Sequence, residues 1–544
     1  MRARANSAGR NGSDTGVSHP SGESDSQLAV SVKQNLPLVK FFQCQDIVVQ
    51  RLAACVDEAL PGDLVCFQTG TNDPVTFAAA ALARGAGAIL TEQLLPCPLP
   101  QAVVGDVQEA ACRIASMLLS DPTAEMLTIG IVGEGGKTST ALLVAGLLKK
   151  IGIRTAYETG LGSSDGIVQS TPAGDAPCGL ELISRLAEAR DAGCGAVVIE
   201  MNGSESGACG ALKLDLLVVT GTYAASGSRS MCQHFGPDPL AIALEQTKGD
   251  AVVILPADQP KLVQRVEESG LRRLSYGLRR DADISAKLFD QQPGTTTLMV
   301  TCGDETAAME TVHCGEAMAM NSLAAVAVGR LLDTPLTEAI AAISRLPMIP
   351  GRMQRLSSYD TAAVVIDAAN TPEQLAMTLR TLRQQQPARG KLWCLLTLGS
   401  RPAEAEDEIQ QIEHQLARSG QLIERFSQRI VLTSTFTAKP TFLRSAHAVL
   451  DGFKNVALAR LITDPIGAVQ WAVAKAAPED TILVVTADEG SSPYERRKSL
   501  LALEAAVEQA RESAEVQRYR APMTLAMPGV GATSGTWNTG PAAS

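Results

Sequence analysis

The chain is poor in the residue types that build metal, redox and hydrolase sites. It has five histidines, which are His19, His234, His313, His414 and His447, and none pairs with another at metal-ligand spacing. We therefore expect isolated surface or capping roles for them. The 12 cysteines form no C-x-x-C pair, which favours reduced thiols over a disulfide framework or a zinc site. No G-x-S-x-G motif is present to support a hydrolase triad.

Basic clusters and long apolar runs are absent as well. Only 19% of the residues are charged and the net charge is -11, so we expect no nucleic-acid partner. No apolar run reaches the roughly 18 residues that span a bilayer, and the first residues are polar. We therefore expect a cytoplasmic, soluble protein that does not associate with membranes.

Length and hydropathy indicate several domains with a disordered tail at each end. With 544 residues and 45% hydrophobic content, the chain can form roughly three or four cores. Residues 1–27 are rich in Ser, Gly, Asn and Asp, and residues 515–544 are rich in Gly, Ala, Thr, Ser and Pro. Neither end has a periodic apolar face, so we expect both to be disordered.

Between the tails, short apolar runs alternate with helix-like segments. This alternation predicts an α/β fold with mainly parallel sheets, whose ligands bind at the carboxyl ends of the strands. The expected strands lie at 64–67, 88–90, 102–104, 127–132, 196–199, 214–219, 251–255, 295–300, 362–366, 392–398, 430–433 and 481–486. Proline turns at 121–122 and 347–352 divide the pattern, which predicts domains at 28–121, 122–346 and 347–514.

A phosphate-binding loop opens the second of these domains. An apolar strand pattern runs directly into Gly133-Glu134-Gly135-Gly136-Lys137-Thr138-Ser139, which is followed by an Ala/Leu-rich helix pattern. Glycines let backbone N–H groups approach a polyphosphate, and a helix N-terminus adds positive potential. Lys137 would reach the outer phosphates and the Thr138 hydroxyl would hold Mg²⁺. The spacing G-x-x-G-x-x-G-K-T, with Gly130 first, differs from the usual G-x-x-x-x-G-K-[ST] because Ile131 stands where the first glycine would be.

The order of several motifs resembles the Mur ligase family, and most closely the step that adds the third amino acid to UDP-N-acetylmuramoyl-dipeptide. The resemblance covers about residues 35–510. It rests on the phosphate loop, on Glu200 after a strand, and on the segments 61–64, 171–172, 321–325, 350–353 and 367–372. It implies three domains: an N-terminal UDP-substrate-binding domain, a central ATP-binding domain and a C-terminal Rossmann-like ligase domain. Such enzymes activate a carboxylate as an acyl phosphate with ATP, and an amine then attacks it.

The resemblance also implies roles for individual residues. Lys137 and Glu200 would be catalytic, and Thr138 and Glu200 would hold Mg²⁺. Asn321 would face the adenine, Arg352 would contact nucleotide at the hinge of the third domain, and Asp367 would hold the ribose or shape the hinge. ATP would be bound by the set Gly133, Gly135, Gly136, Lys137, Thr138, Ser139, Asn321, Arg352 and Asp367.

The chain departs from the family pattern at other positions. The histidine that follows the Glu200 strand in relatives is absent, since the chain reads Glu200-Met201-Asn202-Gly203-Ser204. The family's carbamylated lysine aligns near Glu245, with Lys248 three residues on, so a native carboxylate at Glu245 could serve in its place. The remaining departures lie at 225–230, 367–372, 399–402, 435–440 and 487–491.

Three functional hypotheses follow. The first is an ATP-dependent acid–amino-acid ligase, acting as a monomer on a UDP-linked muramoyl peptide and an amino acid. The second is a catalytically degenerate homologue that binds nucleotide or UDP-muramoyl peptide as a scaffold or regulator, which the departures in the third domain favour. The third is ligation of glutamate to a folate or similar acceptor, which would not need the first domain beginning near Pro61-Gly62-Asp63.

Overall fold

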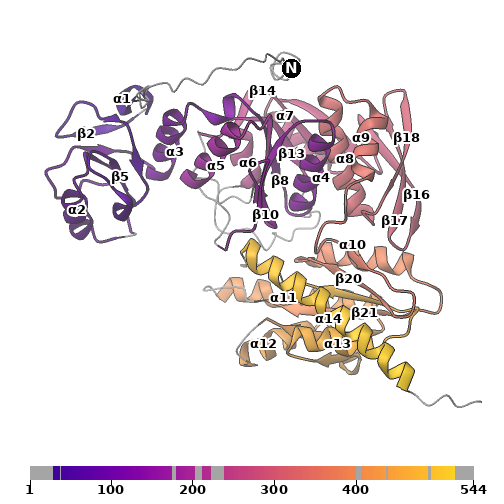
Figure 1. Ribbon diagram of the computed structural model, residues 1–544. Helices are drawn as coiled ribbons and strands as arrows, with labels where there is room; N and C mark the ends of the chain where they lie inside the picture. The colour runs from indigo at the N-terminus through magenta and orange to yellow at the C-terminus, as the bar shows by residue number, and fades with distance from the viewer. Residues whose placement is uncertain are drawn as a thin grey trace, which may run out of the picture.

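The computed structural model describes residues 29–520, apart from 37, 71, 174–178, 202–210, 222–237, 400–405, 436–438 and 488–491. Three α/β units follow one another along the chain, and each is built on its own main sheet. In Figure 1 the first unit lies at the left, the central unit at the upper right and the third unit below the central one. The expected three-domain α/β architecture is confirmed.

The first unit is a small sheet flanked by helices. Its elements are β1 (Val30–Ser31), α1 (Val32–Asn35), β2 (Lys40–Phe42), β3 (Val48–Val49), β4 (Leu52–Ala53), η1 (Val56–Glu58), β5 (Leu64–Phe67), α2 (Pro74–Ala83), β6 (Ala88–Thr91), β7 (Gln101–Val103) and α3 (Val107–Leu118). The main sheet has the order β2-β7-β6-β5-β4. Asp73 and Asp106 cap α2 and α3 by accepting hydrogen bonds from Thr76 N and Glu109 N, which explains where both helices begin.

The central unit contains an 11-stranded sheet. Its elements are η2 (Pro122–Ala124), β8 (Leu127–Val132), α4 (Lys137–Lys150), β9 (Thr155–Thr159), β10 (Gly162–Ser164), β11 (Gln169–Ser170), α5 (Gly179–Asp191), β12 (Ala196–Glu200), β13 (Leu214–Val219), α6 (Pro239–Glu245), β14 (Thr247–Pro256), α7 (Pro260–Glu268), β15 (Arg272–Gly277), β16 (Ile284–Gln292), β17 (Thr295–Cys302), β18 (Glu305–Thr311), α8 (Glu316–Leu331) and α9 (Leu336–Ser344). The strand order is β11-β10-β9-β12-β8-β13-β14-β15-β16-β17-β18.

The two edges of this sheet differ from the predicted parallel pattern. From β9 to β16 in the sheet order, neighbouring strands are parallel, as expected. However, β10 and β11 extend one edge as antiparallel strands, and β16, β17 and β18 form an antiparallel meander at the other. Gly294 and Gly303 adopt φ values of +93° and +57° in the turns of the meander. Glycine-containing turns of this length reverse the chain, so the strand at 295–300 enters a hairpin instead of a parallel crossover.

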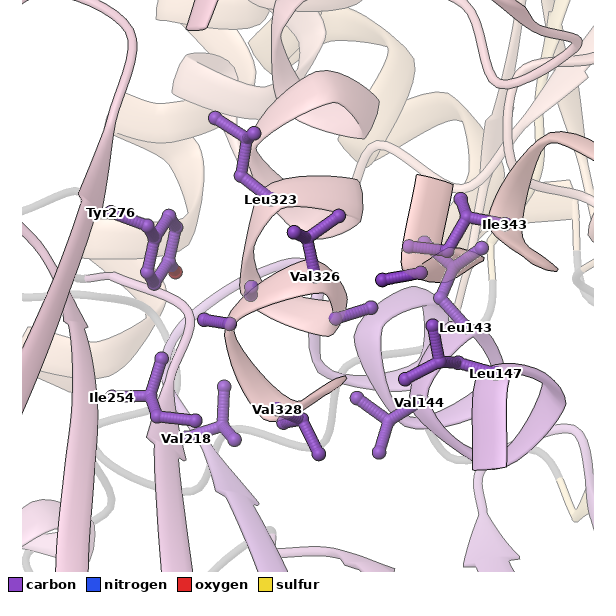
Figure 2. Close-up of a cluster of buried hydrophobic side chains, with 14 of the residues drawn as sticks. Leu143, Val144, Leu147, Val218, Ile254, Tyr276, Leu323, Val326, Val328 and Ile343 are labelled. Atoms are coloured by element: carbon purple, nitrogen blue, oxygen red, sulfur yellow. The ribbon is translucent and has the colours of Figure 1, made fainter. Parts of the chain in front are cut away.

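The phosphate-loop helix α4 is held in place by the buried helix α8. Figure 2 shows Leu323, Val326 and Val328 of α8 between α4 and the sheet side chains of β13, β14 and β15. Eleven of the 16 residues of α8 are buried, so this helix is enclosed on almost every side. The buried Tyr276 hydroxyl donates to the Val219 carbonyl oxygen at 2.9 Å, which satisfies its one polar group. This packing fixes the position of the α4 N-terminus relative to the strands.

The third unit is a six-stranded sheet in the order β19-β20-β24-β21-β22-β23. Its elements are β19 (Gln354–Leu356), β20 (Ala363–Asp367), α10 (Pro372–Gln385), β21 (Leu392–Leu398), α11 (Glu406–Phe426), β22 (Arg429–Ser434), α12 (Lys439–Leu450), η4 (Val456–Leu458), β23 (Ala459–Leu461), α13 (Pro465–Lys475), β24 (Thr481–Val485) and α14 (Pro493–Arg520). β19 is antiparallel to β20, and the other pairs are parallel. The sheet is therefore Rossmann-like, as expected.

The predicted domain limits fall in the connections between these sheets. The limit at 121 lies between α3 and β8, and the limit at 346 lies between α9 and β19; as domain limits they stay predictions. The C-terminal tail was predicted to begin at 515, but α14 continues to Arg520. Residues 1–27 and 521–544 lie outside the described residues.

Candidate functional site

The phosphate loop joins the carboxyl end of β8 to the N-terminus of α4. Gly133 and Gly136 adopt φ values of +146° and +81°, which side-chain-bearing residues rarely adopt. A Cβ atom at Gly136 would lie 2.5 Å from Asn321 Oδ1, and one at Gly133 would lie 2.9 Å from the Gly221 carbonyl oxygen. Both positions therefore require glycine, because of the backbone conformation and because of close neighbours.

Residues after β13 hold this loop in shape. Glu134 N donates to the Gly221 carbonyl oxygen at 3.0 Å, and the Thr220 hydroxyl donates to the Gly135 carbonyl oxygen at 2.6 Å. The Lys137 ammonium donates to the Gly133 carbonyl oxygen at 2.9 Å, so the lysine side chain folds back over the loop. Ser139 follows in the first turn of α4 and is buried. The loop is thus preorganised, and the Lys137 ammonium, which was predicted to bind phosphate, lies across it.

Thr138 and Glu200, the predicted metal ligands, meet in the structure. The Thr138 hydroxyl donates to Glu200 Oε2 at 2.8 Å, although the two residues are 62 positions apart in the sequence. β8 and β12 are adjacent parallel strands, so their carboxyl ends lie together. Oxygen ligands about 2.0–2.1 Å from an octahedral Mg²⁺ stand about 2.9 Å apart when adjacent. The 2.8 Å between these oxygens is thus the length of a hydrogen bond and would also suit two adjacent ligands of Mg²⁺.

The third unit reaches this site through two side chains. Arg496 Nη1, from the first turn of α14, donates to the Gly160 carbonyl oxygen at 2.7 Å. The N–H of the same Gly160 donates to Glu200 Oε2 at 2.8 Å. Gln374 Nε2, from the first turn of α10, lies 3.4 Å from the Glu134 carbonyl oxygen of the phosphate loop. Neither Arg496 nor Gln374 could be predicted from the sequence, because no local motif marks a side chain that acts across a domain interface.

The three predicted nucleotide-binding residues outside the loop fall into two groups. Asn321 lies on α8 against Gly136, beside the loop. Arg352 and Asp367 lie at the hinge, where Arg352 Nη1 donates to the Gly351 carbonyl oxygen at 3.1 Å. Asp367 is buried, and its carboxylate accepts hydrogen bonds from Met353 N at 3.0 Å and from the Thr378 hydroxyl. These contacts match the hinge-shaping alternative for Asp367, while its contact with ribose stays a prediction.

The hypothesis that Glu245 replaces the carbamylated lysine is wrong. Glu245 is exposed and ends α6, immediately before β14 begins. Nearby Lys248 pairs with Asp215, at the start of β13, with 2.8 Å between Nζ and Oδ1. This is the amino end of the parallel strands, whereas the phosphate loop lies at their carboxyl end. The sheet therefore separates Glu245 from the site by the length of its strands.

Several motif departures cannot be located in the structure. Positions 202–204, the segment 225–230, residues 400–402, residues 436–438 and residues 488–491 lie outside the described residues. The described part of the third sheet holds a cavity of about 230 Å³ at the carboxyl ends of β20, β21 and β24. Its lining includes Ala369, Asn370, Gly399 and Ala487, and its charged residues in the described part are Glu413 and Arg444, whose side chains lie 3.3 Å apart.

Other candidate metal or thiol sites are not supported within the described ranges. No group of three His, Cys, Asp or Glu residues could hold a metal ion there. The nine described cysteines form no disulfide. His313 differs from expectation, since it is buried and desolvation lowers the pKa of its imidazole to about 4. No helix in this part of the chain is long and apolar enough to cross a membrane.

A half-buried ion pair joins Glu158 of β9, near the strand end that precedes Gly160, to Arg185 of α5. Burial raises the pKa of the Glu158 carboxyl to about 7, although the Arg185 guanidinium, 3.0 Å away, lowers it. Since this pKa lies above the usual value for glutamate, folding favours the protonated form. The destabilising effect of the Glu158 charge is absent below about pH 4.3 and complete above about pH 7.

We expect Glu158→Gln to gain stability relative to wild type as the pH rises from 5 to 8. The change should be on the order of 1–3 kcal/mol, because the glutamine carries no charge to desolvate. Urea denaturation of both proteins at several pH values measures it. Glu181→Gln is the matched control, since Glu181 is the other carboxylate that pairs with Arg185 and its own side chain is 58% exposed. A stability difference for Glu158→Gln that does not vary with pH would contradict the prediction.

Comparisons with known proteins agree with the fold described above. Residues 351–487 match the family model for the Mur ligase, glutamate ligase domain. A UDP-N-acetylmuramoyl-L-alanyl-D-glutamate--2,6-diaminopimelate ligase from Thermosynechococcus vestitus is 28% identical over 459 residues, covering 80% of this chain and 87% of that protein. A solved structure of an enzyme with the same name matches with a TM-score of 0.60 and 18% identity, covering 89% of this chain and 100% of the other. The MurF ligase from Thermotoga maritima in complex with ADP matches with a TM-score of 0.57 and 19% identity, covering 85% of this chain and 98% of the other.

Proposed function

Because the chain belongs to the Mur ligase family, we propose that it is an ATP-dependent acid–amino-acid ligase of peptidoglycan precursor synthesis. Its substrates would be a UDP-N-acetylmuramoyl peptide, an amino acid and ATP. Since UDP-linked precursors and ATP are cytoplasmic metabolites, the proposal includes a cytoplasmic location. The observation that carries it is the meeting of Thr138, Glu200 and Gly160 beside a preorganised phosphate loop.

The residues at this site could stabilise the negative charge that develops on the phosphate oxygens during the reaction. A carboxylate oxygen of the peptide attacks the γ-phosphorus of ATP, ADP leaves, and the amine then displaces phosphate from the acyl phosphate to form an amide. Lys137 would neutralise charge on the outer phosphates, and the loop N–H groups would bind the phosphate oxygens. Thr138 and Glu200 would hold Mg²⁺, which supplies Lewis-acid stabilisation of the phosphoryl oxygens.

A scaffold or regulator that binds nucleotide without ligation is the second candidate. It is favoured by the cavity in the third sheet, where Ala369, Gly399 and Ala487 lie at the strand ends. Side chains that could bind an acyl phosphate or a charged amino acid are few among the described residues of this cavity. Ligation of glutamate to a folate is less well supported, because the first unit has its own sheet and would have no substrate to bind.

One pair of measurements separates the two candidates. The protein would be incubated with ATP, Mg²⁺, UDP-N-acetylmuramoyl dipeptide and a panel of amino acids, and tripeptide would be detected by mass spectrometry. Nucleotide binding would be measured by calorimetry on the same preparation. Tripeptide that depends on ATP supports the ligase. Nucleotide binding without tripeptide for any amino acid supports the scaffold, and the absence of both contradicts the proposed nucleotide site.

A further inference from the structure

The N-terminus of α14 is fixed by a reciprocal pair of hydrogen bonds. Glu495 N donates to the Ser492 hydroxyl at 3.3 Å, and Ser492 N donates to Glu495 Oε2 at 3.3 Å. This is a capping box, which satisfies two N–H groups at the start of a helix. Tyr494 N donates to the Pro172 carbonyl oxygen of the central unit at 3.1 Å. Arg496 therefore projects from a helix end that is ordered locally and docked onto the central unit.

The Arg496 guanidinium lies beside the predicted metal ligands. Its Nη1 bonds to the carbonyl oxygen of Gly160, the residue whose N–H bonds to Glu200. A Cβ atom at Gly160 would lie 2.5 Å from Arg496 Nη1, 3.6 Å from Glu200 Oε2 and 3.7 Å from Thr138 Oγ1. The missing side chain of Gly160 therefore leaves the space in which the guanidinium, the carboxylate and the hydroxyl converge.

The same helix contacts the hinge between the central and third units. A Cβ atom at Gly351 would lie 2.9 Å from Leu500 Cδ2, and Gln354 Nε2 donates to Glu504 Oε1 at 2.6 Å. Arg511 Nη2, further along α14, donates to the Leu356 carbonyl oxygen at 2.8 Å. One continuous helix thus connects the hinge segment 351–356 to the phosphate site. A rotation of the third unit about the hinge would carry Arg496 toward or away from Gly160.

The chemistry of arginine indicates what this arrangement could recognise. A guanidinium is charged at every physiological pH, and its planar fork of N–H donors matches two phosphoryl oxygens. The backbone and the lysine of a phosphate loop cradle the β- and γ-phosphates, and Thr138 and Glu200 would hold Mg²⁺ beside them. A cation beside those two ligands therefore faces the outermost phosphate and not the α-phosphate or the ribose.

We propose that Arg496 binds the γ-phosphoryl group of ATP and is supplied by the third unit when that unit closes on the central one. The proposal rests on the nucleotide site of the proposed function. It adds a residue that binds the γ-phosphate from the other side of the domain interface. Arginines supplied in this way to phosphoryl-transfer sites stabilise the charge of the transition state. It follows that ATP, but not ADP, favours the closed arrangement.

The test compares the affinities of a nonhydrolysable ATP analogue and of ADP, each with Mg²⁺, by calorimetry. Arg496→Gln should weaken analogue binding about tenfold and change ADP binding by less than about twofold. Arg496→Lys keeps the charge without the planar fork of N–H donors, so its loss of analogue affinity should lie between those of wild type and Arg496→Gln. Lys498→Gln is the matched control, because Lys498 is an exposed cation on the same turns of α14 and should change neither affinity.

The other possible results would contradict either this proposal or the proposed function. Equal losses for both nucleotides in Arg496→Gln and Arg496→Lys would show that the arginine only holds the interface together and would overturn the proposal. Unchanged affinities in folded variants, confirmed by thermal melting, would also overturn it and leave the proposed function intact. If wild type bound neither nucleotide, the nucleotide site of the proposed function would itself fail.

Discussion

Replacing Lys137 by alanine is expected to weaken ATP·Mg²⁺ binding at least about tenfold, equivalent to about 1.4 kcal/mol. If the protein ligates, turnover should fall by about a hundred- to a thousandfold, which is the usual cost of removing one group that stabilises transition-state charge. The reason is that Lys137 is the cation of the phosphate loop itself, with its ammonium 2.9 Å from the Gly133 carbonyl oxygen. Alanine is compatible with the helix, but it removes the ammonium, its aliphatic stem and its hydrogen bond to Gly133.

Calorimetry of wild type, Lys137→Ala and Lys150→Ala tests this expectation. Lys150 is the matched control, because it is an exposed lysine at the opposite end of the same helix. Its removal should leave ATP affinity unchanged. If Lys137→Ala and wild type bound ATP with equal affinity, the assignment of the phosphate loop would be wrong.

Glu200→Gln is expected to cause the second large effect, on Mg²⁺-dependent nucleotide binding. The substitution preserves volume and leaves an oxygen that can still accept from Thr138 and Gly160, so the local structure should persist. The carboxylate charge that would hold Mg²⁺ is lost, however. We expect the Mg²⁺ concentration needed for half-maximal ATP binding to rise at least about tenfold, with a fall in any turnover of about a hundredfold or more.

Magnesium titrations at fixed ATP measure this effect. Glu245→Gln is the control, because Glu245 lies at the amino end of the strands and is exposed. It should behave like wild type, and this also tests the corrected position of that residue. Identical magnesium dependence of Glu200→Gln and wild type would remove Glu200 from the metal site.

The elements that could be predicted from the sequence are those specified by neighbouring residues. The strand β8, the loop glycines and the helix α4 follow one another within 24 residues, Leu127 to Lys150, and each is set by local apolar periodicity or by backbone freedom. The pairing of Thr138 with Glu200 could also be anticipated. Glu200 ends β12 and Thr138 follows β8 through the loop, and parallel strands present their carboxyl ends at one edge of a sheet.

Predictions that depended on counting along a gapped alignment were less successful. Glu245 was placed at the site by its distance in sequence, but α6 runs back to the amino end of the sheet before β14 begins. The sheet was predicted to be mainly parallel, and the antiparallel strands at its edges were not predicted. The residues of a single polar strand do not indicate whether a hairpin or a crossover connection joins it to the next strand.

By itself, the sequence determined the three α/β units, the phosphate loop and the residue types around it, because backbone conformation and hydrophobic periodicity are local properties. Only the tertiary structure decided which distant side chains complete the site. Arg496 lies 336 positions from Gly160, and its guanidinium reaches that carbonyl oxygen only because α14 docks across the domain interface. Contacts of this kind depend on how whole units pack, and no local pattern of residues encodes that packing.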